Sequence, residues 1–455
     1  MTIKSVHITN YYHKNSGGIS TAYNKLLEAA NRRKRLVRLI VPGEQAAIED
    51  VGDFGRIYFI KASYSPVFDK RYRIMMPWNT YLLDAAPIKT ILRKEAPDVI
   101  EIGEKYTLPL MAGLLRKGIL NVSEKRPMLV HLSCERMDDN VGSFISAGKI
   151  SKWFCRRYMG TYNIPMFDFH LANSEYTAQE MFDAVSQSDG RDRSDLILNF
   201  FWRFLRAPKV DLKQRIFVNP CGVDNEIFTA SRKHSSKRNE IVKELDLSPT
   251  SKLLLYAGRL SPEKNIGLLA KMMRVLNSDP AYDFRLLIAG AGPSLERLKG
   301  DAAKLRPGTV KVLGHINDKE KLADLFANCD AFIHPNPREQ FGITPLEAMA
   351  SGLPVIAPNA GGVLSYANLD NAWLTEPTAE DFAASVRDVF SNEIVRGSKI
   401  AAALETAQKY TWEYSTDTVF DLYDKMFAEF TGRRDAYDYR ESPAEINFAA
   451  QFTTC

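Results

Sequence analysis

Short apolar segments alternate with longer amphipathic segments along most of this chain. The apolar segments, which we expect to be strands, are residues 5–9, 36–42, 98–102, 128–133, 169–174, 215–220, 252–258, 285–290, 311–315, 331–335 and 353–358. Helix-like segments such as 20–33, 265–277 and 318–329 lie between many of them. Strands that alternate with helices predict βαβ units, and therefore doubly wound α/β sheets with parallel strands.

The predicted strands are too numerous for one compact sheet. A chain of 455 residues is long enough for two or three domains. We place a break near residues 221–224, and expect an N-terminal Rossmann-like domain over 1–220 and a C-terminal one over 221–410. The two domains would face each other across a cleft, because ligands of such sheets bind at the carboxyl ends of the strands.

The composition indicates a soluble globular protein, with 45% apolar and 25% charged residues. The five cysteines are scattered without a C-x-x-C pair, which argues against a zinc ribbon or a disulfide scaffold and fits a reducing cytosol. The first residues lack the apolar stretch of a signal peptide, and no apolar run is long enough to cross a bilayer. We therefore expect a cytoplasmic protein, soluble or peripheral to the membrane.

The positive charge is concentrated in the first half. Residues 1–222 hold 33 Lys and Arg against 23 Asp and Glu, in a chain of net charge +5. A basic half suggests an anionic partner such as phosphate, an anionic lipid surface or nucleic acid; the alternative is an ordinary solvated surface. No RNA-binding or helix-turn-helix signature accompanies the charge, so nucleic acid is not expected.

The stretch HPNPREQFGITPLEAMASGLPVIAPNAGG, which begins at His334, is unusually dense in Gly, Pro and acid. We expect a loop at the carboxyl end of strand 331–335 and then a helix, with Thr344 as N-cap and Glu347 three residues later, which is the pattern of a capping box. Glu347 could serve only that cap. Alternatively, the helix N-terminus faces the cleft and holds a diphosphate. Glu339 lies in the loop, where a carboxylate could bind sugar hydroxyls.

Other candidate residues follow other strands. Arg259 and Lys264 come after strand 252–258, where two cations would suit a diphosphate, although surface charges are the simpler explanation. The GAGPSL segment lacks the last glycine of the dinucleotide fingerprint, so a redox Rossmann enzyme is disfavoured. The NSGGIS segment lacks the Walker lysine. Its Gly17 and Gly18 would let the backbone approach a ligand or the opposite domain.

Taken together, these segments resemble the retaining glycosyltransferases of the GT-B fold, sequence family four. EQFGITPLE matches the E-x7-E motif of that family, and further landmarks match in order: ANSEYTAQEM, NPCGVDNEIF, AGRLSPEKN, IAGAGP, KVLGHI and ASGLPVIAPNAGG. Residues 411–431 resemble the C-terminal helix that crosses back onto the first domain. Residues 186–211 depart from the pattern and resemble an insertion. The tail, 432–455, has no clear period, and we expect it to be loosely ordered.

The resemblance implies roles for individual residues. Glu339 would hold hydroxyls of the transferred sugar and Glu347 the nucleotide ribose, while His131 would lie near the reacting carbon unless it is a core histidine. The diphosphate would be held by Arg259 and Lys264 together with the backbone of Gly342, Ile343 and Thr344. The base would be read by the backbone of Leu313, Gly314 and His315.

The expected chemistry is departure of a nucleoside diphosphate, stabilised by fixed cations and N–H donors. No acidic ligand pair of the DxD type stands out, so we expect no metal and no other cofactor. The family retains anomeric configuration, by front-face attack in which the leaving phosphate takes the acceptor's proton. No carboxylate is evident as a nucleophile for double displacement.

The donor and the acceptor are less constrained. SCERMDD (133–139) and DKRYRIMMP (69–77) are similar to segments of bacterial GDP-mannose-dependent mannosyltransferases, while UDP-glucose and UDP-galactose stay open. NRRKRLVR and KWFCRRY are basic, and NFFWRFLR interleaves aromatic residues with arginines, which suits an anionic membrane and a lipid or lipid-linked glycan acceptor. The alternative for NFFWRFLR is a helix with its aromatics packed inward. A GT-B-like epimerase, a phosphorylase with a pyridoxal-phosphate lysine, and a non-catalytic sugar-nucleotide sensor are lesser alternatives.

Overall fold

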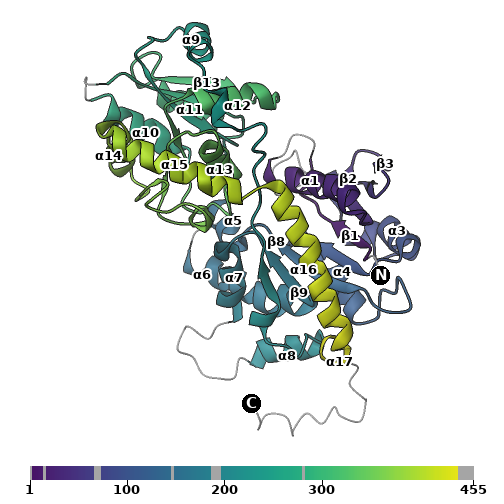
Figure 1. The fold of residues 1–455 in the computed structure, drawn as a ribbon. Coiled ribbons are helices and arrows are strands. Elements are labelled where there is room, and N and C mark those ends of the chain that lie inside the picture. The colour runs from purple at the N-terminus through teal and green to yellow at the C-terminus, as the bar shows by residue number, and fades with distance from the viewer. Residues whose placement is uncertain are drawn as a thin grey trace.

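The structure is a computed structural model that describes residues 3–13, 17–65, 73–144, 148–185, 196–278 and 282–438. It contains two large β-sheets that are covered by helices and lie next to each other, with the first sheet formed by the N-terminal half of the chain (Figure 1). Each sheet buries apolar residues on both faces, as parallel sheets do. The fold class is therefore α/β with two Rossmann-like halves, as the alternating pattern predicts.

The first sheet has eight strands, parallel except at one edge. In spatial order they are β10 (Ile216–Val218), β9 (Phe169–Ala172), β8 (Met128–Ser133), β7 (Val99–Ile102), β1 (Ser5–Ile8), β2 (Val37–Gly43), β4 (Gly55–Lys61) and β3 (Ala47–Val51). Only β3 is antiparallel, to β4. Its exposed sequence AIEDV lacks the apolar pattern of the other strands. The helices of this half are α1 (Gly18–Arg33), α2 (Pro77–Thr80), α3 (Pro87–Glu95), α4 (Pro109–Arg116), α5 (Met137–Phe144), α6 (Lys149–Tyr158), α7 (Glu175–Val185) and α8 (Leu196–Phe204).

The second sheet is entirely parallel. Its strands are β13 (Val310–Gly314), β12 (Phe284–Ala289), β11 (Lys252–Ala257), β14 (Ala331–Ile333), β15 (Val355–Pro358) and β16 (Trp373–Thr375). Its helices are α9 (Ser235–Glu244), α10 (Gly267–Leu276), α11 (Leu295–Ala302), α12 (Lys319–Asn328), α13 (Ile343–Ala350), α14 (Ala379–Ser391) and α15 (Glu393–Lys409). A separate hairpin pairs β5 (Ser63–Tyr64) with β6 (Arg73–Ile74). The limits of the two domains, 220 and 410, stay a prediction.

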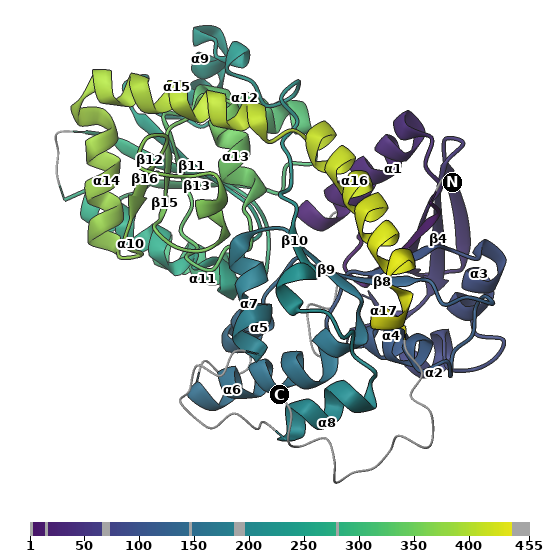
Figure 2. The same cartoon turned by 60° about the horizontal axis from the view of Figure 1, so that its bottom comes forward.

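The helix α16 (Trp412–Gly432) leaves the second half and lies along the first half, beside α1 (Figures 1 and 2). Arg33 and Asp421 form an ion pair between the two helices, with Nη2 of Arg33 2.7 Å from Oδ1 of Asp421. Inside, the hydroxyl of Tyr423 donates to the buried carboxylate of Glu101 on β7. The helix therefore joins the two halves through both surface and core contacts.

The expectation of a loosely ordered tail is wrong for its first residues. Residues 434–437 form the short helix α17 (Arg434–Tyr437), and Tyr437 is completely buried. Its backbone carbonyl accepts a hydrogen bond from Arg116, at 2.9 Å, which fixes this turn on the first half. Residues 439–455 lie outside the described residues, as do residues 186–195 of the predicted insertion.

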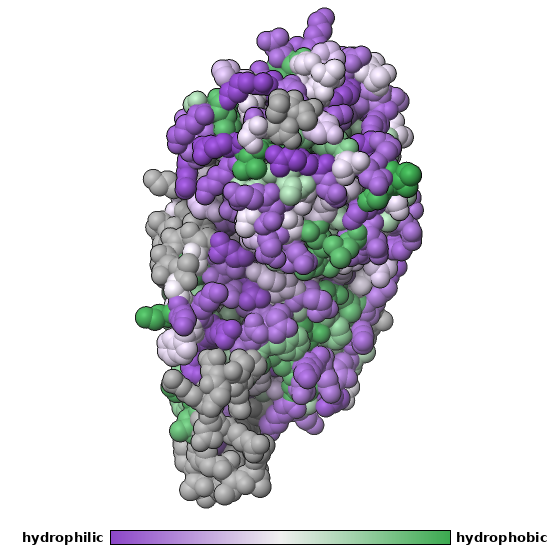
Figure 3. Space-filling view, turned by 90° about the vertical axis from the view of Figure 1, so that its left-hand side faces the viewer, coloured by the Kyte–Doolittle hydropathy of each residue, from purple (hydrophilic) through white to green (hydrophobic). Residues whose placement is uncertain are grey.

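The surface is mainly polar on the face shown in Figure 3, where apolar side chains form only small groups. Among the described residues, no helix combines the length and the apolar character that crossing a bilayer requires.

Candidate active site

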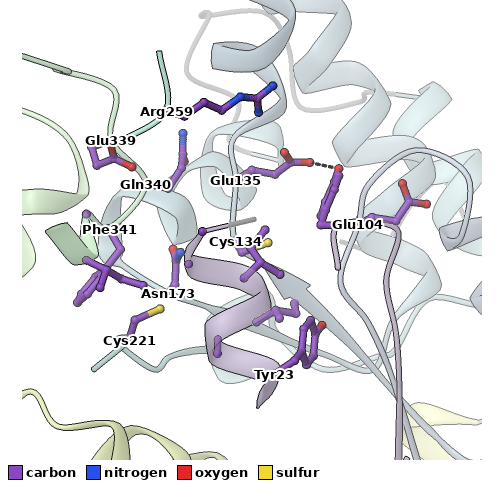
Figure 4. A pocket seen from close by; sticks show the side chains of 18 of the residues that line it. Tyr23, Glu104, Cys134, Glu135, Asn173, Cys221, Arg259, Glu339, Gln340 and Phe341 are labelled. Atoms are coloured by element: carbon purple, nitrogen blue, oxygen red, sulfur yellow. Dashed lines mark hydrogen bonds between the residues drawn. The ribbon is translucent and has the colours of Figure 1, made fainter. Parts of the chain in front are cut away.

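A cavity of about 540 Å³ lies between the two halves and is lined by residues of both. From the first half come loops that follow β1, β7 and β8, and from the second half loops that follow β11 and β14. All of these loops leave the carboxyl ends of parallel strands, which is where sheets of this type bind ligands. Figure 4 shows Glu339 and Glu104 on opposite sides of this cavity, with Arg259 and Glu135 between them.

The structure brings most of the predicted donor-site residues into this cavity. Its lining includes Gly17, Gly18, Arg259, Lys264, Glu339, Gly342, Ile343 and Thr344. Five predicted residues do not line it: His131, Leu313, Gly314, His315 and Glu347. The roles of all these residues stay predictions. Gly17 and Gly18 line the cavity from the first half, and the other six line it from the second half.

Lys264 and Glu339 form an ion pair on the second-half wall of the cavity. Lys264 Nζ lies 2.9 Å from Oε1 and 2.8 Å from Oε2 of Glu339. Asn336 Nδ2 donates to Oε2 at 3.2 Å. Burial alone would raise the pKa of the Glu339 carboxyl, but the Lys264 ammonium outweighs it and the pKa falls to about 2. Glu339 is therefore a fixed carboxylate at every physiological pH.

The loop that carries Glu339 is shaped by two glycines, Gly361 and Gly362, that pack against it. The Gly362 N–H donates to the carbonyl of Glu339 at 2.6 Å. A Cβ on Gly362 would lie 1.9 Å from the carbonyl oxygen of Gln340, and Gly361 has φ +81°. Only glycine fits both positions, because one has no room for a side chain and the other has a left-handed backbone. Gly361 and Gly362, which end the Gly- and Pro-rich segment that begins at His334, thus support the loop that carries Glu339.

The predicted capping box at Thr344 is wrong. Helix α13 begins at Ile343, and its N-cap is Gly342, whose φ of +86° turns the chain into the helix two residues earlier than expected for a Thr344 cap. Tyr366 donates to the Gly342 carbonyl and holds this conformation. The Glu347 carboxylate consequently does not cap the helix, and its oxygens make no hydrogen bond with the described residues. Burial raises the pKa of the Glu347 carboxyl to about 7.

His131 does not line the cavity that holds most of the predicted site residues. It is completely buried within β8, and its Nδ1 lies 3.3 Å from Nδ1 of His170 on β9. Its ring packs against Phe167 with a centroid distance of 5.1 Å. Burial lowers the pKa of His131 well below its ordinary value. A residue inside a parallel strand packs in the core, whereas residues just beyond the strand reach the ligand, so the alternative of a core histidine is favoured.

The predicted base-reading segment ends β13, at the edge of the second sheet. Leu313 packs against the core of that half, and His315 is exposed. Gly314 has φ +75°, a conformation that glycine adopts without strain. The segment lies at the carboxyl end of its strand but outside the described cavity, so contact with a base stays a prediction.

Two acidic residues on the first-half wall of the cavity, Glu135 and Glu104, were not predicted from the sequence. Glu135, just after β8, accepts hydrogen bonds from Tyr11 Oη at 2.5 Å and from Asn140 Nδ2 at 2.6 Å. Glu104, just after β7, accepts the backbone N–H of Thr107 at 2.6 Å, and burial raises its pKa to about 7. The available signal was position alone, because each acid follows the carboxyl end of a predicted strand.

Among the described residues, no group of three or more His, Cys, Asp or Glu side chains could hold a metal ion. The cations Arg259 and Lys264 are the positive groups on the second-half wall of the cavity that follow β11. A diphosphate placed beside them would meet charge of the right sign.

Residues 237–409 match the family model described as Glycosyl transferases group 1. The chain carries a group 1 glycosyltransferase domain. This domain includes Arg259, Lys264 and Glu339, and it makes the protein an enzyme of the transferase class. The match agrees with the resemblance that the motifs of the sequence indicate.

Two curated relatives of this glycosyltransferase carry names that include inositol-containing molecules. It is 26% identical over 411 residues to the GDP-mannose-dependent alpha-(1-6)-phosphatidylinositol dimannoside mannosyltransferase of Mycobacterium tuberculosis, covering 90% of this chain and 93% of that protein. It is 30% identical over 241 residues to the D-inositol 3-phosphate glycosyltransferase of Stackebrandtia nassauensis, covering 50% and 52% of the two chains.

Solved structures show that the glycosyltransferase has the GT-B fold. Sucrose-phosphate synthase from Thermosynechococcus elongatus superposes with a TM-score of 0.68 at 17% identity, covering 94% of this chain and 100% of that one. The catalytic domain of starch synthase IV from Arabidopsis thaliana superposes with a TM-score of 0.65 at 15% identity, covering 95% and 100%.

Proposed function

We propose that this glycosyltransferase moves a hexose from a nucleotide-diphosphate sugar to a lipid or glycan acceptor, with retention of configuration. The observation that carries the proposal is the Lys264–Glu339 pair beside Arg259, at the carboxyl ends of β11 and β14. One group is suited to a diphosphate and the other to sugar hydroxyls. Both lie in a cavity that the first half closes from the opposite side.

In this mechanism Arg259 and Lys264 bind the diphosphate and stabilise the charge that develops on it as the sugar–phosphate bond breaks. The backbone N–H groups at the start of α13, next to Gly342, would bind the same phosphates, because the positive end of the helix dipole lies there. The two cations would do the work that a metal does in other transferases, so we propose that the reaction needs no metal and no other cofactor.

Retention would follow from front-face attack, in which the departing phosphate takes the proton of the acceptor hydroxyl. Glu339 is poorly suited to be a covalent nucleophile, because Lys264 and Asn336 already bind its carboxylate. Glu339 would instead hold the sugar, and Glu347, whose carboxylate has no hydrogen-bond partner among the described residues, would take the ribose hydroxyls.

GDP-mannose is the donor we favour, because the Mycobacterium tuberculosis relative that spans most of the chain is named for it. UDP-glucose and UDP-galactose are the alternatives. The test is to incubate the purified protein with these nucleotide sugars and measure nucleoside diphosphate release, then follow the anomeric configuration of the product by NMR. Release from one donor with retention supports the proposal. Tight binding without turnover, even with phosphoinositol acceptors, would favour the lesser alternative of a sugar-nucleotide binding protein.

A lipid acceptor is supported by exposed apolar side chains on α6 and α8. These two helices lie near each other at one end of the first half (Figures 1 and 2). We call this the α6–α8 surface. It comprises Ile150, Trp153 and Phe154 on α6, and Leu196, Ile197, Phe200 and Phe204 on α8, all of them at least half exposed. The exposed Lys149 and Lys152 lie on the same α6 helix. Apolar side chains mixed with cations suit an anionic membrane surface.

The aromatic residues of α8 fall into two groups. One packs inward against the protein and the other is exposed, so that it could contact a membrane. Trp202 donates its indole N–H to the carbonyl of Gly160 at 2.7 Å, so it attaches the helix to the protein. Phe200 and Phe204 stack on each other and are 55% and 52% exposed. We propose that these two rings face the inner leaflet of the plasma membrane, where a cytoplasmic, peripheral enzyme would meet its lipid acceptor.

A further inference from the structure

His334 is a buried polar residue on the same wall as Glu339. It directly follows β14, is only 4% exposed, and contributes to the lining of the cavity. Its Nε2 atom has no hydrogen-bond partner among the described residues. Most buried polar atoms in proteins do have a partner, so an unpaired one beside a cavity points to a ligand atom that is missing here.

The ring of His334 is neutral and its orientation is fixed. Burial lowers the pKa of His334 to about 4, so the ring carries one N–H at neutral pH. The ring forms a hydrogen bond with the backbone of Asn336 that favours its protonation. Since Nε2 makes no bond, Nδ1 is the nitrogen that donates to Asn336. Nε2 therefore presents a lone pair.

That lone pair lies next to another acceptor. His334 Nε2 is 3.6 Å from Oε2 of Glu339, and because the ring is neutral the two atoms do not form an ion pair. Two acceptors at this separation cannot satisfy each other; each needs its own donor. Lys264 and Asn336 bind Glu339 from other directions, and no described side chain donates to Nε2.

We propose that His334 Nε2 and Glu339 Oε2 together bind two neighbouring hydroxyl groups of the transferred sugar. Adjacent hydroxyls of a sugar ring supply two O–H donors side by side, which matches two side-by-side acceptors. This inference rests on the proposed function and adds His334 as a residue that selects the donor sugar. A site built to accept from a hydroxyl discriminates strongly against an analogue that lacks it, because its buried acceptor is then unpaired.

The test compares His334→Leu with wild type on GDP-mannose and on its monodeoxy analogues, each lacking one ring hydroxyl. If the protein releases nucleoside diphosphate from UDP-glucose instead, the monodeoxy analogues of UDP-glucose are used. We expect His334→Leu to lower kcat/KM for the complete donor at least about tenfold, and to cause little further loss with the one analogue that lacks the hydroxyl bound by His334. Affinity for GDP alone should be unchanged, and His334→Gln, which keeps an acceptor oxygen, should recover part of the activity.

The matched control is His234→Leu, which alters an exposed histidine of the same half that does not line the cavity. The inference is overturned if His334→Leu has normal kinetics while the wild type turns over, if the loss is the same for every analogue, or if GDP binding weakens equally. If the wild type releases no diphosphate from any nucleotide sugar, the proposed function itself fails, and this inference falls with it.

Discussion

Lys264 and Glu339 bind each other at two points, with Nζ within 3 Å of both carboxylate oxygens. In the free protein each group thus neutralises the other. The proposed reaction requires them to act on different parts of one substrate, the cation on the diphosphate and the carboxylate on the sugar. The donor would therefore replace an internal ion pair by two substrate contacts.

Removing the cation of this pair should destabilise the protein. In Lys264→Ala, the Glu339 carboxylate stays buried with Asn336 as its remaining side-chain donor, so we expect a loss of roughly 1–3 kcal/mol in the free energy of unfolding. Chemical denaturation at neutral pH measures it. Adding Glu339→Gln to this variant should recover part of the loss, because an amide is cheaper to bury than a charge. The control Lys271→Ala removes an exposed lysine of α10. Equal stability of the single and double variants would contradict the account.

The carboxyl group of Glu347 should make stability depend on pH. Its pKa is raised from 4.5 to about 7 in the folded protein, so the folded state keeps a proton that the unfolded state loses. This stabilisation is complete below about pH 4.5 and is lost as the pH rises through 7. Glu347→Gln should remove it and be about 1–3 kcal/mol more stable than wild type at pH 8. Denaturation curves from pH 5 to pH 8 test this, and parallel curves for the two proteins would refute it.

A methyl group on Gly362 should displace the loop that carries Glu339. In Gly362→Ala the Cβ would meet the backbone of Gln340 at 1.9 Å, which is far below contact distance. We expect both a lower melting temperature and a loss of nucleotide-sugar affinity. The matched control is Gly397→Ala on α15, where nothing lies within 4 Å of the added Cβ. This control should raise stability by roughly 0.5–1 kcal/mol, as alanine does in a helix. Normal donor binding by Gly362→Ala would be the contrary result.

The α6–α8 surface should bind anionic membranes. We expect Phe200→Ser with Phe204→Ser to reduce sedimentation with anionic liposomes, because each ring exposes about half of its surface to solvent. Trp202 is left intact, since it anchors the helix. The control variant, Leu369→Ser with Ile394→Ser, removes exposed apolar side chains of the second half. Liposome binding that both variants reduce equally, or that neither reduces, would rule out this surface.

The strands were predictable because most of them are buried on both faces. All eleven apolar segments expected to be strands are strands, from β1 to β15. Five strands were missed. β3 is an exposed edge strand, and β5, β6 and β16 have only two or three residues, but β4 (GRIYFIK) is mostly buried and was overlooked despite its apolar residues. A continuous apolar run is a reliable signal only where helices cover both faces of the sheet.

The site was predictable where it depends on residue type, and not where it depends on backbone conformation. Lys264 and Glu339 were expected in one cavity and are found there. Helix α13 begins at Ile343 because Gly342 adopts a left-handed conformation. The Thr-x-x-Glu pattern instead predicted a start after Thr344. His131 was assigned to the site although it belongs to the strand, whereas Glu135, beyond the strand end, is the residue that lines the cavity.

Metal-independent turnover is the most direct test of the central claim. Nucleoside diphosphate release would be measured in the presence of EDTA, with the nucleotide sugar that the wild type uses as donor. The proteins compared are the wild type, Lys264→Ala, Glu339→Ala and the control Lys271→Ala. The account predicts undiminished release by wild type and the control, and a loss of at least about 10²-fold in kcat for the two site variants. Full activity of either site variant, or abolition of wild-type activity by EDTA, would contradict it.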